Sequence, residues 1–117
     1  RRHPNLRVAT IESGSDWMPG LVRTLKKSYG QTPGAYDGVD PVQQVRDHVW
    51  VSPYYEDPIP ELRDTIGAER IIFGSDYPHA EGLADPLSFV DDLRGFTDAE
   101  VRLVMRENCL ELSKPRR

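Results

Sequence analysis

The sequence predicts an α/β fold with a parallel sheet, because short β-prone runs alternate with segments of helical periodicity along its 117 residues. The β-prone runs are residues 6–11, 49–52 and 70–73, and no two-residue hairpin turn joins them. Polar side chains follow each run at its carboxyl end, where parallel α/β folds place their chemistry. A sheet of this size is small and leaves open edges, which is typical of a piece of a larger fold.

The first helices are predicted from apolar spacing and from residues that begin a helix. Residues 17–29 and residues 59–66 carry apolar side chains at helical spacing. Asp40 precedes a short helix over residues 42–47, because its side chain can accept hydrogen bonds from the free amides of a first turn. The glycine-rich residues 30–40 predict an irregular connection with a role as a lid.

The C-terminal part of the sequence predicts two further helices. The first opens at Asp85, and its predicted apolar face is made of Leu87, Val90 and Leu93. The second opens at a capping box, in which the Thr97 hydroxyl and the Glu100 carboxylate satisfy exposed amides. This helix is expected to run to about residue 112 and to contain Cys109 as a small core residue.

Composition indicates a soluble protein without a nucleic-acid or membrane partner. The formal net charge is -4, whereas nucleic-acid binders concentrate a basic excess on one face. The basic residues Arg1, Arg2 and 114–117 are expected to be solvated tails. No apolar run approaches the ~18 residues of a membrane span, and a single cysteine fits a reducing compartment. We therefore expect a cytoplasmic protein.

The strongest candidate site follows the third β-prone run. Asp76 lies just past its end, and His79 and Glu81 follow on the same loop. Carboxylates and imidazoles are ligands of divalent metal ions, so this loop can hold or support a metal. The alternative for Asp76 is a turn residue whose carboxylate bonds its own backbone.

The other strand ends supply further candidates. Glu12 follows the first run and would come near Asp76 in a parallel sheet; the alternative is a solvated loop acid or a partner of the next helix start. Tyr54 follows the second run, and together with Tyr36, Tyr55 and Tyr77 it is a candidate for a substrate pocket, although loop tyrosines also serve as packing residues. Sequence motifs of nucleotide-binding loops, serine hydrolases and zincins do not occur.

The run Ile-Ile-Phe-Gly-Ser-Asp-Tyr-Pro-His over residues 71–79, with Glu81 and Gly82 after it, resembles the end of a known family. This is the amidohydrolase-related family that includes the aminocarboxymuconate-semialdehyde decarboxylases. The early stretch from His3 to residue 19 and the closing residues 107–112 are also similar to members of this family. The resemblance spans nearly the whole chain, and its most specific part is the run that contains Asp76.

The resemblance implies a metal-dependent (β/α)8 TIM barrel, of which this chain would supply strands six to eight. Such a barrel takes about 250 residues, so residues 1–117 would form a single partial domain. The family's metal-binding aspartate at the end of strand eight maps onto Asp76. The His-x-His pair of strand one and the His of strand five lie outside this sequence, and Glu12 stands where many relatives carry a His.

These features predict part of a hydrolase or non-oxidative decarboxylase that acts on a small carboxylated substrate, cyclic or derived from an aromatic ring. The cofactor would be a divalent metal, expected to be zinc, with Asp76 as its ligand. The predicted catalytic residues are Asp76 and His79, and the predicted substrate-binding residues are Glu12, Tyr54, Tyr77 and Glu81. We expect the chain alone to bind metal weakly, to be inactive, and to associate with itself or with the rest of a barrel. The alternative is a standalone α/β binding module.

Overall fold

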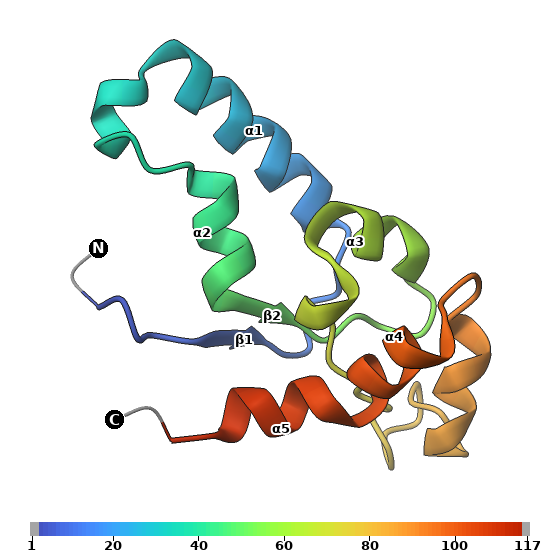
Figure 1. Cartoon of the computed structure of the whole chain (residues 1–117). Coiled ribbons are helices and arrows are strands. Elements are labelled where there is room, and N and C mark those ends of the chain that lie inside the picture. The colour runs from blue at the N-terminus through green and yellow to red at the C-terminus, as the bar shows by residue number, and fades with distance from the viewer. Residues whose placement is uncertain (1–2, 116–117) are drawn as a thin grey trace.

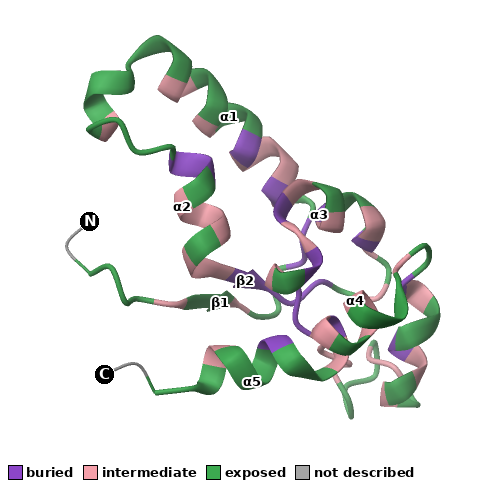
Figure 2. Cartoon of the chain, viewed as in Figure 1, coloured by how far each residue is buried: buried purple, intermediate pink, exposed green. Residues whose placement is uncertain are grey.

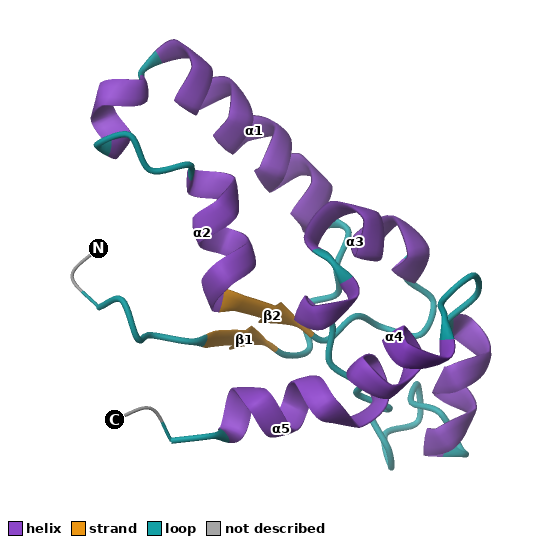
Figure 3. Ribbon diagram, viewed as in Figure 1, coloured by secondary structure: helices purple, strands orange, loops and turns teal. Residues whose placement is uncertain are grey.

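A computed structural model describes residues 3–115 as helices packed around a small parallel sheet (Figures 1 and 3). Strands β1 (Val8–Thr10) and β2 (Val49–Val51) pair in parallel over their whole length. On the other side of β2, a parallel bridge joins Val51 to Ile71. The predicted parallel α/β arrangement is therefore confirmed for this part of the chain.

The helical segments follow the predicted order. In chain order they are α1 (Trp17–Gln31), η1 (Pro33–Tyr36), α2 (Pro41–His48), α3 (Ile59–Ile66), η2 (Ala68–Arg70), η3 (Pro86–Asp92), α4 (Asp98–Arg102), η4 (Leu103–Glu107) and α5 (Asn108–Ser113). Segments η1 to η3 are 3-10 helices, and η4 is a π-helical segment. Because α4, η4 and α5 follow one another without a break, they form one continuous C-terminal helix with a π turn in its middle.

The residues predicted to begin helices do so by the expected hydrogen bonds. The Asp40 carboxylate accepts from the Val42 amide at 2.8 Å, at the start of α2. In the capping box, the Thr97 amide donates to the Glu100 carboxylate at 2.8 Å, and the Glu100 amide donates to the Thr97 hydroxyl at 3.3 Å. At the end of α3, Gly67 has a φ of 90°, and its amide donates to the Arg63 carbonyl. These bonds satisfy backbone groups that a helix end leaves without intrahelical partners.

The core lies where β2, α3 and the C-terminal helix meet, and β1 remains largely exposed (Figure 2). Val51, Ile71 and Val104 are fully buried at this junction. The core is completed by apolar side chains of the remaining helices, namely Met18, Val22, Val42, Ile59, Leu62, Ile66, Phe89 and Leu93. No helix among the described residues is long and apolar enough to cross a membrane.

The third predicted strand is reduced to the single bridge at Ile71. Arg70 ends the 3-10 helix η2 and is not extended. Beyond it, Ile72 donates to the Val51 carbonyl, but Phe73 donates to the carbonyl of Val104 in the C-terminal helix. A helix, and not a further strand, therefore bonds the outer side of residues 71–73.

Two predictions about side-chain burial also need correction, one for the helix that begins after Asp85 and one for Cys109. The buried residue of η3 is Phe89, whose ring meets Phe73 edge to face at 5.3 Å, whereas Leu87 is 69% exposed and Val90 is also exposed. Cys109 is exposed and not in the core, since it is rotated by about 100° from the buried position of Asn108 on the same helix.

Residues 30–40 are partly helical, because α1 continues to Gln31 and η1 follows. In Figure 1 this segment lies at the far end of α1 from residues 75–83, so it does not cover that loop. The basic residues predicted as tails at 1–2 and 116–117 lie outside the described residues. Lys114 is described, and its ammonium pairs with the Glu111 carboxylate at 2.8 Å.

Candidate functional site

The carboxyl ends of the strands open into one cleft of about 480 Å³. It lies where the chain leaves β1, β2 and residues 71–73, which is the edge predicted to carry the chemistry. Its lining comprises Glu12, Tyr54, Tyr55, Glu56, Asp57, Gly74, Ser75, Asp76, His79 and Glu81. The structure therefore brings together every predicted site residue except Tyr77, whose side chain is 62% exposed, and the pocket candidate Tyr36, and neither of these lines the cleft.

The loop that carries Asp76 is held by a series of backbone turns. The His79 amide donates to the Asp76 carbonyl at 2.8 Å, and the Gly82 amide donates to the His79 carbonyl at 3.0 Å. The Leu83 amide closes the loop by donating to the Ser75 carbonyl at 2.9 Å. A Cβ at Gly82 would lie 2.5 Å from the Asp76 carbonyl oxygen, so the close approach of the two loop ends requires glycine there.

Two carboxylate residues of the cleft have left-handed backbone conformations. Asp76 has a φ of 56°, and Glu12 has a φ of 54°. Such values are uncommon for residues other than glycine, and they are retained where the surrounding structure fixes them, often at functional sites. Glu12 lies two residues after the end of β1, and Asp76 lies three residues after Phe73.

Asp76, His79 and Glu81 form a cluster of metal-ligating groups. One ligand atom from each lies within 4.8 Å of the other two, and His79 Nδ1 is 3.9 Å from Asp76 Oδ2. Two ligands of a zinc ion, each about 2.0–2.2 Å from it, can be at most about 4.4 Å apart, so the observed spread fits an ion after a small closure. The Asp76 side chain is 26% exposed and that of His79 is 68% exposed, which leaves one side of the cluster open.

Glu12 and Asp76 act on one another across the cleft. A hydrogen bond with Asp76, together with the charge of that carboxylate, raises the pKa of Glu12 above its ordinary value of 4.5. A shared hydrogen bond between two carboxyl groups requires a proton on one of them, which is why the proton is held more tightly. The predicted proximity of Glu12 and Asp76 is therefore confirmed.

The second wall of the cleft ties the loop after β1 to the loop after β2. The Asp57 carboxylate accepts from the buried Ser15 hydroxyl at 2.9 Å and from the Tyr54 amide at 3.0 Å. A Cβ at Gly14, whose φ is 57°, would lie 3.2 Å from the Tyr54 ring, so this glycine fits closely against it. These contacts fix Tyr54 beside Glu12 in the wall of the cleft.

The sequence analysis weighed Tyr55 as a residue of a substrate pocket, and this residue lines the cleft, but the analysis did not single out Glu56 and Asp57. All of them lie in the polar turn that follows the second strand, and position after a parallel strand was the signal that could have found them. A hydrogen bond to the Glu56 carboxylate raises the pKa of the Tyr55 hydroxyl. Within residues 3–115, the charged groups of the lining are thus carboxylates, without lysine or arginine.

Comparisons with known proteins agree on one family. The model of a family described as Amidohydrolase matches residues 1–112, and this chain belongs to that family. The chain is also similar to a crystal structure of an amidohydrolase from Mycobacterium avium subsp. paratuberculosis K-10. That likeness has a TM-score of 0.88 at 49% sequence identity and covers 95% of this chain but 29% of the other. No curated protein matches the chain.

The opposite pKa shifts of Glu12 and Glu100 predict opposite effects of replacing each by glutamine. Because the folded state raises the pKa of Glu12, its proton stabilises the fold at low pH, and this stability is lost as pH rises through the folded pKa. Glu12→Gln should therefore raise the urea midpoint at pH 7, with a smaller effect below about pH 4.

Glu100→Gln is the matched control. Hydrogen bonds from Thr97 lower the pKa of Glu100, so its charge stabilises the fold at pH 7 and this stability is lost as pH falls through the folded pKa. This substitution should lower the urea midpoint at pH 7. If Glu12→Gln also lowers the urea midpoint at pH 7, the carboxylates of Glu12 and Asp76 do not repel one another as described.

Proposed function

We propose that this chain is part of a metal-dependent hydrolase or non-oxidative decarboxylase related to the aminocarboxymuconate-semialdehyde decarboxylases. We base this chiefly on the cluster of Asp76, His79 and Glu81 at the carboxyl end of a parallel sheet, in a chain of a family that is generally metal-dependent. The free thiol of Cys109 supports the proposed cytoplasmic location.

The proposed fold of the parent protein is a (β/α)8 barrel, with β1, β2 and residues 71–73 as strands six, seven and eight. These segments are parallel and adjacent in chain order, and helices connect them, as in a barrel. The chain spans 29% of the length of the Mycobacterium avium relative, so a parent protein of that length would have room for the remaining units. The remaining units would lie in other parts of the parent protein.

In this proposal Asp76 is the metal ligand that this chain contributes, and zinc is the proposed ion. When bound, such an ion supplies a Lewis acid that activates water or polarises a substrate carbonyl. His79, close to the Asp76 carboxylate, is placed to move a proton, and Glu81 lies beside both. Glu12, whose pKa is raised by the neighbouring Asp76, lies where it can exchange a hydrogen bond with substrate.

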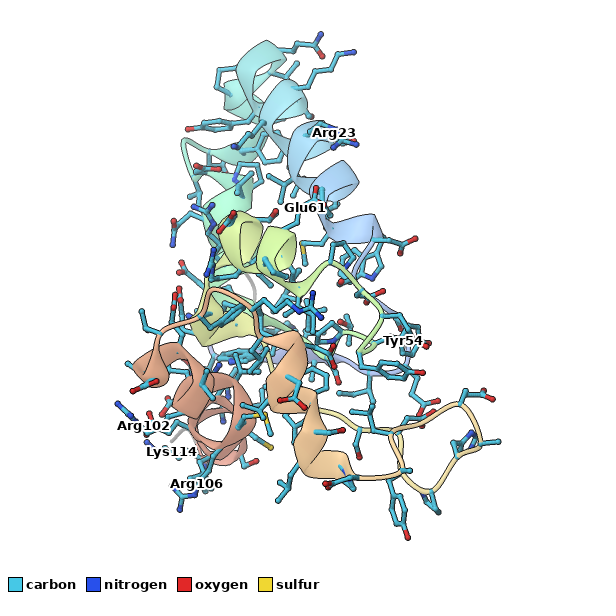
Figure 4. The ribbon with its side chains drawn as sticks, turned by 90° about the vertical axis from the view of Figure 1, so that its right-hand side faces the viewer. Arg23, Tyr54, Glu61, Arg102, Arg106 and Lys114 are labelled. Carbon is cyan, nitrogen blue, oxygen red and sulfur yellow. The ribbon has the colours of Figure 1, made fainter. Side chains whose placement is uncertain are left out.

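The proposed substrate is a small carboxylated molecule, cyclic or derived from an aromatic ring. Tyr54 and Tyr55 offer aromatic surfaces in the cleft wall, and Tyr77 would contact a substrate from the rim. In Figure 4, Arg102, Arg106 and Lys114 lie on the other side of the view from Tyr54, and no described lysine or arginine lines the cleft. The substrate carboxylate would therefore be met by the metal ion or by residues outside this chain.

We also propose that the chain associates through the outer edge of β1, with itself or with the rest of a barrel. The Ser52 amide donates to the Thr10 carbonyl, so Thr10 faces β2 and its neighbour Ala9 directs its backbone groups away from the sheet. Among the described residues no strand pairs there. Leu6 and Ile11 beside this edge are 57% and 56% exposed, so association would also remove apolar surface from water.

The metal assignment predicts that Asp76→Asn weakens zinc binding by this chain at least about 10-fold. Changing a group that merely orients a metal ligand already lowers the affinity by about 10-fold or more, so loss of the ligand itself should cost no less. Calorimetric zinc titration measures it. The matched control is Asp47→Asn, in an exposed carboxylate of α2 that accepts from Gln43 outside the cleft, and its affinity should equal that of the wild type.

A chimera tests the barrel. This chain would replace the matching segment of the Mycobacterium avium amidohydrolase, which is 49% identical to it. We expect the chimera to retain a tightly bound divalent ion by elemental analysis and the Asp76→Asn chimera to lose it. A folded chimera that retains its metal without Asp76 would contradict the assignment, and metal-dependent turnover by this chain alone would contradict its proposed inactivity.

The edge assignment predicts that Ala9→Pro makes the chain monomeric. Proline removes the amide donor on the open side of β1 while leaving the bonds of Val8 and Thr10 to β2 intact. Sedimentation velocity over a range of concentrations should show association of the wild type and a single slow species for the variant. The proposed association would be contradicted if the wild type sedimented as a stable monomer and also unfolded cooperatively.

A further inference from the structure

Residues 71–73 have hydrogen-bonding groups on two sides. On one side, the Ile72 amide donates to the Val51 carbonyl of β2 at 2.9 Å. Since successive residues of an extended chain direct their backbone groups to alternate sides, Ile71 and Phe73 present theirs to the opposite side. In a sheet, a further strand would bond these groups.

The C-terminal helix makes these bonds instead. The Phe73 amide donates to the Val104 carbonyl at 3.1 Å. The Asn108 side-chain amide donates to the Ile71 carbonyl at 2.7 Å and to the Ala68 carbonyl at 2.8 Å. Asn108 is only 3% exposed, so both hydrogens of its side-chain nitrogen are committed to buried backbone acceptors.

The π turn makes the Val104 carbonyl available. In an α-helix the Asn108 amide would bond Val104, four residues back, but here it donates to Leu103, five residues back. The Val104 carbonyl is thereby released from its α-helical donor and accepts from Phe73. The π turn thus provides the hydrogen-bond acceptor for Phe73, and the Asn108 side chain donates to Ile71 of the same extended segment.

This fixed segment leads directly to the metal-ligand candidate. Only Gly74 and Ser75 separate Phe73 from Asp76. Gly74 lies so close to Ser52 that a Cβ would come within 2.5 Å of the Ser52 hydroxyl oxygen. The left-handed backbone of Asp76 follows at once. A strained conformation of this kind persists only where adjoining structure determines it, and the bonds to the helix supply that constraint.

We propose that Asn108 is a positioning residue for Asp76, which it holds in place through residues 71–73. The inference rests on the proposed function, because it takes Asp76 as a metal ligand. Asn108 touches neither the cleft nor the proposed metal ligands, so its effect on metal binding is exerted through the backbone.

The test compares zinc affinity in Asn108→Ala and Val42→Ala, each measured by calorimetry where circular dichroism shows a folded chain. Val42 is a buried core residue of α2, so its truncation destabilises the fold without removing a bond to residues 71–73. Asn108→Ala should weaken zinc binding about 10-fold, as changes to groups that support a ligand do. Val42→Ala should change it less than about 2-fold, because a general loss of stability leaves the folded site intact.

Hydrogen exchange of the wild type provides a second readout that needs no variant. If the helix positions Asp76, saturating zinc should slow exchange of the Phe73 amide in return, because coupling between two sites is reciprocal. The positioning role would be overturned if Asn108→Ala and Val42→Ala bound zinc with equal affinity. It would also be overturned if saturating zinc left the exchange rate of the Phe73 amide unchanged. Failure of the chimera that carries the wild-type Asp76 to retain a divalent ion would instead overturn the proposed function.

Discussion

The arrangement of this chain depends on hydrogen bonds at both sides of residues 71–73. β2 bonds one side through Ile72, and the C-terminal helix bonds the other through Val104 and Asn108. Residues 71–73 are therefore bonded on both sides within this chain, whereas the outer edge of β1 has no strand partner among the described residues. The same bonds place the start of the Asp76 loop against the end of β2.

The site combines strong local order with an incomplete set of groups. Backbone turns and a close glycine contact fix the loop of Asp76, His79 and Glu81, and Glu12 arrives from the end of β1. The resulting groups are mostly acidic, and such a set is stabilised by a cation or by protons. This is the electrostatic state expected of part of a metal site, in which opposed carboxylates are retained for function at a cost in stability.

The sequence predicted what depends on local chemistry. The caps at Asp40 and Thr97 and the position of Asp76 after an apolar run were confirmed, because neighbouring residues determine them. The third strand failed as a prediction, since its outer bonds come from Asn108, far along the chain. The π turn and the cleft residues Glu56 and Asp57 depend on tertiary packing in the same way, and apolar spacing carries no information about either.

The central claim is that a divalent ion binds to Asp76, beside His79 and Glu81, at the carboxyl end of the sheet. Paramagnetic broadening of backbone amide signals on titration with Mn²⁺ tests it most directly, because it locates the ion even when binding is weak. The predicted result is selective broadening of the signals of residues 76–81 and of Glu12, abolished by Asp76→Asn. Broadening centred on another acidic part of the surface, or unchanged by that substitution, would contradict the claim.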